Sequence, residues 1–70
     1  MPEILFEMQY VGRVVRVTAI DPATGIEVVS VGDADRSIAA LQRLAARKLG
    51  YVLKRRAEEQ AERKERGETA

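Results

Sequence analysis

The segment RVVRVTAIDPATGIEVVSV, residues 13–31, decides the fold, because it reads as two strands joined by a tight loop. β-Branched residues dominate the stretches 13–20 and 26–31, and such residues are enriched in strands. Between them stands DPATG, residues 21–25, where the aspartate can bond its own backbone, the proline presets φ and the glycine accepts a left-handed conformation. The sequence therefore predicts a β-hairpin.

A further strand is predicted before this hairpin, where apolar and polar residues alternate in EILFEMQYV. One of its faces carries Ile4, Phe6, Met8 and Tyr10. With a turn at Val11–Gly12, Met8 lies opposite Val15 and Glu7 lies opposite Arg16, so that apolar residues meet and opposite charges meet. A glycine bulge at this turn would shift the pairing.

An amphipathic helix is predicted after GDAD, residues 32–35, which breaks the third strand. Asp33, Asp35 or Ser37 could accept hydrogen bonds from the first free amides of this helix. Its apolar stripe consists of Ile38, Leu41, Leu44, Ala45, Leu49, Val52 and Leu53. Because a strand spans roughly 26 Å, which a helix crosses in about 18 residues, the sheet is expected to end near Arg55.

The predicted fold class is α+β: a three-stranded antiparallel β-meander in the order 1-2-3, followed by one long C-terminal α-helix packed on one face (βββα). We expect residues 1–56 to form a single domain and residues 57–70 to form a charged helical extension that frays at its C-terminus. The expected core residues are Ile4, Phe6, Met8, Val15, Val17, Ala19, Val29, Val31, Ile38, Leu41, Ala45, Leu49 and Val52. The sequence leaves two registers open for the third strand, in which Val28 and Val29 exchange faces.

The residue inventory argues against catalysis and metal binding. The 70 residues contain no Cys and no His, so thiolate and imidazole groups are absent and a Ser or Thr nucleophile lacks its usual base. We therefore predict that the chain is not an enzyme and has no catalytic residue, cofactor or metal. No apolar run approaches the roughly 20 residues that cross a bilayer, and the N-terminus lacks a signal-peptide pattern. A cytoplasmic location is expected.

The sheet face that the single helix leaves open is the first candidate surface. Its predicted apolar members are Leu5, Val14, Thr18, Ile20, Ile26 and Val28. Large exposed apolar patches tend to mark interaction sites. This pattern favours a non-enzymatic protein-interaction module, with a homodimer through the open face or an edge strand as its simplest form.

The solvent side of the helix is the second candidate surface. Arg36, Arg43, Arg47 and Lys54 follow one another at intervals of seven, four and seven residues and so lie along one line. Together with Arg13 and Arg16 they would allow a nucleic-acid-binding module, which is the alternative function. The structural explanation is a solvated helix face filled with good helix formers.

A family resemblance is carried by the segments GRVVRVTAIDPATGIEVVSVGD and RKLGYVLKRR. The chain resembles a family of short uncharacterised alphaproteobacterial proteins grouped as a domain of unknown function. The resemblance covers residues 3–56. It implies a bacterial, cytosolic, single-domain protein, and it carries over no activity, ligand or catalytic residue.

Overall fold

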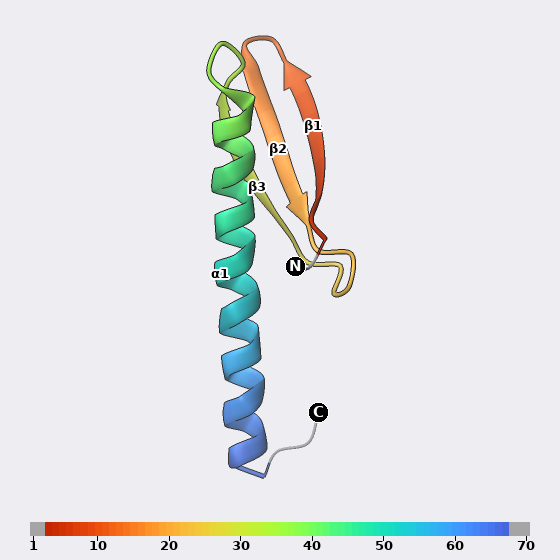
Figure 1. The fold of residues 1–70 in the computed structure, drawn as a ribbon, viewed down its shortest axis with the longest axis vertical. Coiled ribbons are helices and arrows are strands. Elements are labelled where there is room, and N and C mark those ends of the chain that lie inside the picture. Colours follow the sequence, from red (N-terminus) through yellow and green to blue (C-terminus); the bar gives the residue numbers. More distant parts are fainter. Residues whose placement is uncertain (1–2, 68–70) are drawn as a thin grey trace.

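The computed structural model describes residues 3–67 and has the predicted α+β architecture (Figure 1). Three strands, β1 (Leu5–Val11), β2 (Val14–Ile20) and β3 (Glu27–Asp33), form an antiparallel sheet in the order β1-β2-β3. One helix, α1 (Ile38–Glu65), follows and lies along a single face of this sheet. The fold class and strand order predicted from the sequence are confirmed.

A two-residue turn of Gly12 and Arg13 joins β1 to β2, with Val11 opposite Val14 at its base. Gly12 has a φ of 59°, while Arg13 keeps a negative φ. This is the pattern of a type II′ turn, which has glycine at its first central position and matches the twist of the flanking strands.

The predicted turn at Val11–Gly12 is therefore wrong by one residue, and the pairing moves by two. Met8 lies opposite Val17, and Glu7 lies opposite Thr18 instead of Arg16. A shift of two residues keeps every side chain on its predicted face, because strand side chains alternate with a period of two. The turn forms at Gly12–Arg13 because a β-branched valine is unfavourable in the left-handed position that glycine accepts.

The loop between β2 and β3 is organised by Asp21, as the DPATG motif predicted. Its carboxylate accepts hydrogen bonds from the Ala23 amide at 3.3 Å and from the Thr24 hydroxyl at 2.8 Å. Its backbone N–H donates to the Ile26 carbonyl at 2.9 Å, and its carbonyl accepts from the Gly25 amide at 2.8 Å. Asp21 is buried, and these hydrogen bonds offset the cost of removing its polar groups from water.

The register of β3 settles which valine faces the helix. Val28 lies opposite Ala19, and Val29 lies opposite Thr18. Because Ala19 is buried under α1, Val28 belongs to the helix-facing side and Val29 to the open side. The expected core positions at Val29 and Val31 were wrong, and Val31 is exposed.

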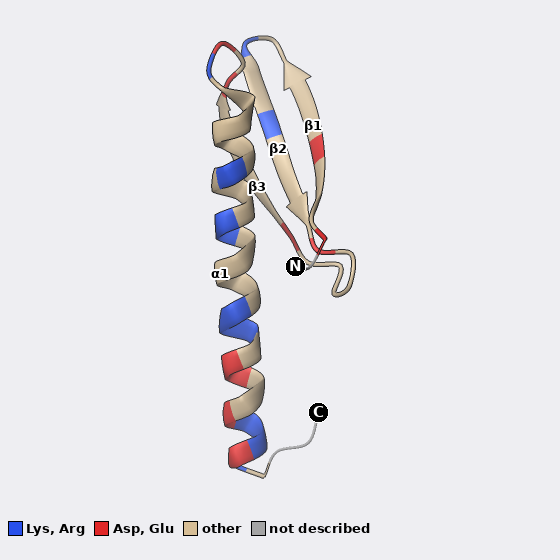
Figure 2. Cartoon of the chain, viewed as in Figure 1, with Lys and Arg blue, Asp and Glu red and all other residues tan. Residues whose placement is uncertain are grey.

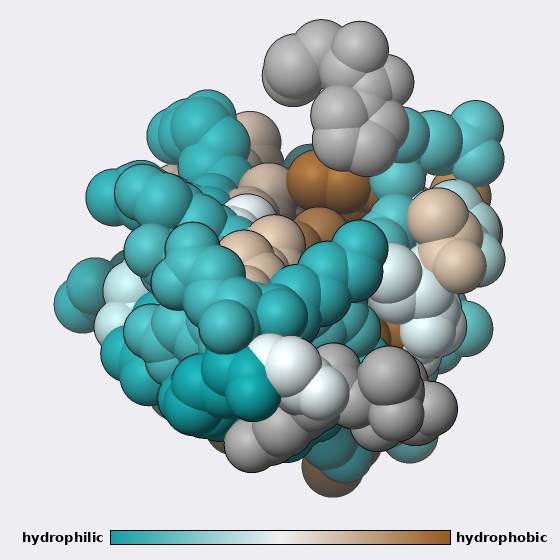
Figure 3. All heavy atoms as spheres, turned by 90° about the horizontal axis from the view of Figure 1, so that it is seen from below, coloured by the Kyte–Doolittle hydropathy of each residue, from teal (hydrophilic) through white to brown (hydrophobic). Residues whose placement is uncertain are grey.

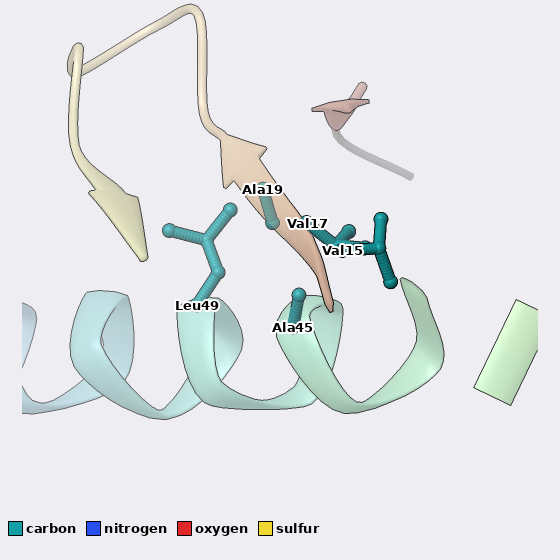
Figure 4. Packing of buried hydrophobic residues seen from close by; sticks show 5 residues of the cluster. All are labelled: Val15, Val17, Ala19, Ala45 and Leu49. Atoms are coloured by element: carbon teal, nitrogen blue, oxygen red, sulfur yellow. The ribbon is translucent and has the colours of Figure 1, made fainter. Parts of the chain in front are cut away.

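The core lies between β2, β3 and α1 (Figure 4). Its fully buried members are Val15, Val17, Ala19, Ala45 and Leu49, with Ile4, Ile26, Val28, Ala34, Ile38, Leu41 and Leu53 packed around them. Phe6 and Met8 were expected in this core and are instead exposed. Val52 is half-buried beside it.

The helix begins after Ser37, whose hydroxyl accepts a hydrogen bond from the Ala40 amide at 3.2 Å. Of the three predicted capping residues, Ser37 is the cap, while Asp33 ends β3. The helix continues well past its last core contact at Leu53, so the molecule is elongated, with extents of 50 × 19 × 17 Å. Gly67 follows the C-terminal end with a φ of 78°, a conformation that commonly stops a helix.

Beyond Leu53 the helix surface is charged (Figure 2). Residues 54–65 span about 18 Å at the standard helical rise per residue, and all of them are exposed. Viewed from the C-terminal end of the helix, hydrophilic side chains stand in front and hydrophobic ones show behind them (Figure 3). The last three residues of the predicted extension, 68–70, lie outside the described residues.

Candidate functional site

Strand β1 is exposed along its whole length, although it belongs to the sheet that the helix covers. All seven of its residues are exposed. On the helix-facing side Phe6, Met8 and Tyr10 keep 37%, 46% and 58% of their surface open to solvent. We call these three residues the β1 row. Together they form an apolar strip beside the helix.

The β1 row is uncovered because α1 packs mainly on β2 and β3. Small residues on β3 allow this position: Ser30 and Gly32 face the helix, and a Cβ atom placed on Gly32 would lie only 2.9 Å from Leu41 Cδ2. The bulky β1 row could not admit a helix so closely. Toward β1, Gln42 Nε2 donates to Met8 Sδ at 3.9 Å.

The outer edge of β1 carries backbone groups that no strand pairs within residues 3–67. The Arg13 carbonyl accepts from the Ala34 amide at 2.8 Å, so the backbone of Arg13 points toward β3. Backbone direction alternates along an antiparallel strand, so Val14 points toward β1 and bonds Val11 across the turn.

The same alternation continues down β1. Val11, Gln9, Glu7 and Leu5 direct their backbone groups to β2, while Tyr10, Met8 and Phe6 direct theirs to the free edge. The β1 row therefore combines exposed apolar side chains with free N–H and C=O groups on the same residues. Such an edge is a template for pairing with another chain.

The open face of the sheet carries four of the six predicted interface residues. Leu5 and Val14 are exposed there, and Thr18 and Ile20 are half-buried. Val28 faces the helix, as its register shows, and Ile26 packs against the core. The exposed side chains Val11 and Val31 join the open face in their place, while Glu7, Gln9, Arg16, Glu27 and Asp33 divide it with polar groups.

The basic residues of the alternative function lie on separate surfaces. Arg43, Arg47 and Lys54 are exposed, and the helical periodicity places them on the side of α1 opposite the buried Ala45 and Leu49. Arg36 precedes the helix and has its Nε 3.9 Å from the Asp33 carboxylate. Arg13 stands in the β1–β2 turn, and Arg16 stands on the open sheet face. The sheet separates Arg16 from the helix residues, so one duplex cannot touch both.

A small apolar hollow lies between the edge of β3 and the flank of the helix. It is lined by Val28, Leu44, Arg47, Lys48, Tyr51 and Val52. Beside it the Arg55 guanidinium donates to the Tyr51 hydroxyl at 3.2 Å and lies 6.0 Å from the ring centre. The hydrogen bond to Tyr51 raises the pKa of Arg55 above its ordinary value. This arrangement braces two exposed side chains one helical turn apart.

The described residues contain neither a cluster of candidate metal ligands nor a membrane-spanning helix. Between residues 3 and 67 no three Asp or Glu side chains come together as a metal site would require. In the same part of the chain, no helix has the length and apolarity to cross a membrane. Asp21 is the one buried carboxylate of this part, and its oxygens are occupied by the turn.

Sequence reasoning missed the β1 row because its alternation is that of a buried strand face. The available signal was the width of the helix: a cylinder about 10 Å across cannot cover three strands spaced about 4.8 Å apart together with their side chains. The small residues Ser30 and Gly32 then indicate which edge the helix prefers.

Comparison with known proteins adds one match. No curated protein and no solved structure is similar to the chain at the level that would indicate a relationship. A family described as a domain of unknown function, DUF6898, matches residues 1–56, which end shortly after Leu53, the last helix residue that packs on the core. The match covers most of the chain, and the protein therefore belongs to this family.

Proposed function

We propose that this protein is a non-enzymatic protein-interaction module that binds through strand β1. The observation that carries the proposal is the β1 row. Its residues Phe6, Met8 and Tyr10 have exposed side chains, and their backbone N–H and C=O groups point to the unpaired edge of the sheet. Extended segments add to such edges by main-chain hydrogen bonds, and side chains supply specificity. A bacterial cytoplasmic setting is part of the proposal.

Natural proteins usually protect a sheet edge with charged side chains, proline, bulges or a covering segment. Between Leu5 and Val11 the strand has one charged residue, Glu7, and no proline. No positive-φ residue interrupts it. An edge without these protective features is expected in a protein that uses the edge for binding.

Nucleic-acid binding is the second candidate. The observation in its favour is that Arg43, Arg47 and Lys54 are exposed in one line on α1. Against it stand the separation of Arg16 from this line and the acidic residues Glu58 and Glu59 that follow on the same helix. Phosphate-tracking surfaces concentrate positive charge more strongly.

A pull-down from a lysate of the source organism separates the two candidates. The bait is the full chain, used with and without nuclease treatment and compared with Met8→Pro. Proline at position 8 removes an N–H that points to the free edge, so the β1–β2 ladder keeps its bonds. The proposal expects a protein that is retained after nuclease treatment and lost with Met8→Pro. Recovery only from untreated lysate supports nucleic-acid binding instead.

A further inference from the structure

We infer that the occupant of the β1 edge is a second copy of this chain, paired antiparallel through β1 in a register centred on Met8. The inference rests on the proposed function and names its partner. Two three-stranded sheets then become one continuous sheet, with both helices on the same face. A two-fold axis through the Met8 pair relates the copies, as in most small homodimers.

Backbone direction limits the possible registers. In an antiparallel pair, a residue that points outward must meet another that points outward. The outward residues of β1 are Phe6, Met8 and Tyr10, so only registers that match these three among themselves form hydrogen bonds. Registers displaced by one residue would set outward groups against inward ones and form none.

Among the allowed registers, the one centred on Met8 uses every outward residue of the strand. Its opposed pairs are Met8 with Met8, Phe6 with Tyr10, Glu7 with Gln9, and Leu5 with Val11. Apolar residues meet apolar residues, an aromatic pair forms on each side of the axis, and the single carboxylate meets a neutral amide. Pairs of this kind stabilise antiparallel strands.

Charge and length disfavour the neighbouring registers. A register centred on Glu7 places two carboxylates directly opposite each other, which is destabilising, and sets Tyr10 against Ile4, which precedes the strand. A register centred on Gln9 sets Phe6 against Gly12, which belongs to the turn. The sequence of β1 is therefore self-complementary about Met8.

The position of the helix leaves room for this assembly. Because α1 packs on β2 and β3, the two β1 rows lie side by side in a trough between the two helices. Pairing covers the side chains of Phe6, Met8 and Tyr10, which the isolated chain leaves 37%, 46% and 58% exposed. A contact of one strand and one side-chain row is at the small end of interface sizes, so the dimer is expected to depend on concentration.

Sedimentation velocity of the full chain over a range of concentrations tests the association. We expect a monomer–dimer equilibrium that Met8→Pro weakens by roughly tenfold or more, the factor that corresponds to about 1.4 kcal/mol of lost pairing. Far-ultraviolet circular dichroism of Met8→Pro checks that the monomer remains folded. A wild-type chain that stays monomeric at millimolar concentration overturns the inference, as does a dimer that a folded Met8→Pro leaves intact.

Cysteine pairs test the register, because the described chain has no cysteine of its own. Residues 7 and 9 of opposite copies would form a non-hydrogen-bonded pair with Cα atoms about 4.5 Å apart, within disulfide range. A mixture of Glu7→Cys and Gln9→Cys chains should cross-link as a heterodimer under mild oxidation. Cross-linking of Glu7→Cys with itself, or of Gln9→Cys with itself, in preference to the mixture overturns the Met8-centred register.

Two charge variants provide a matched control. Gln9→Glu faces Arg16 within its own hairpin but faces Glu7 of the second copy, so it should stabilise the monomer and weaken the dimer. Gln9→Lys reverses both effects. If dimerisation and monomer stability change in the same direction, the register is wrong. A monomeric chain whose capture of a different protein still depends on Met8 contradicts self-pairing and leaves the proposed function standing.

Discussion

Gly32 of β3 lies directly beneath Leu41 of α1, so close that a Cβ atom on the glycine would stand 2.9 Å from Leu41 Cδ2. This contact sets the helix over β2 and β3 and thereby leaves β1 uncovered. Gly32 was expected to break the third strand, and it instead lies inside β3 opposite Val15. Because Gly32 has no side chain, Leu41 of the helix can approach the strand closely at this position.

Gly32→Ala should lower the free energy of unfolding by about 1 kcal/mol, because the added methyl group overpacks against Leu41. Urea denaturation of the single and double variants checks this. In a Leu41→Ala background the cost should disappear, since the methyl group then occupies vacated space. Additive effects in this double-mutant cycle would show that the two residues do not restrain each other.

Ser30→Ala should raise the stability by about 0.5 to 1 kcal/mol, because removing a buried polar group that lacks a partner removes its desolvation penalty. The Ser30 side chain is 2% exposed, and its hydroxyl has no hydrogen-bond partner within the described residues. Ser37→Ala is the matched control, since this serine caps the helix and its loss should cost about 1 kcal/mol. Thermal unfolding of both variants measures the two effects, and a destabilised Ser30→Ala would contradict the assignment.

Asp21→Ala should destabilise the protein by about 1 to 2 kcal/mol, because it removes the acceptor of the Ala23 amide and the Thr24 hydroxyl. Asp21→Asn should cost less, since an amide oxygen can still accept from Ala23. Chemical denaturation of the two variants gives the comparison. Equal losses would mean that the carboxylate contributes through something other than these bonds.

Shortening the chain after Arg56 should preserve the fold and change the free energy of unfolding by less than about 1 kcal/mol, because surface helix pairs contribute only tenths of a kcal/mol each. Of the residues removed, those numbered 57–67 are described, and they are exposed and follow the last core contact at Leu53. Circular dichroism should show the loss of only the removed helical turns. Loss of cooperative unfolding would show that the extension supports the domain.

Much of this fold follows from local chemistry in the sequence. The DPATG turn, the β-branched strands and the apolar stripe of the helix each agree with a single architecture. The register of the first hairpin depends on which position of the turn Gly12 occupies. Its positive φ fits the first central position, and this places Arg13 at the second. The face of β3 was ambiguous because Val28, Val29 and Val31 are all apolar, and only burial under α1 separates them.

The candidate site was harder to predict, because it depends on where the helix stops covering the sheet. The sequence placed Phe6 and Met8 in the core by their alternation, which is correct for the direction of their side chains and wrong for their exposure. Lateral placement of the helix is a tertiary property, decided by the space above Ser30 and Gly32. The open face was anticipated at Leu5 and Val14, while the row beside the helix was not.

Amide hydrogen exchange along β1, measured as a function of protein concentration, tests whether this edge pairs with a second copy. In dilute solution the amides of Glu7 and Gln9 should be protected by β2, while those of Phe6, Met8 and Tyr10 should exchange rapidly at the free edge. At high concentration the latter three should become protected together as two copies pair. Uniform protection along β1 in dilute solution, or rapid exchange of these three amides at every concentration, would contradict the claim that β1 is a self-pairing edge.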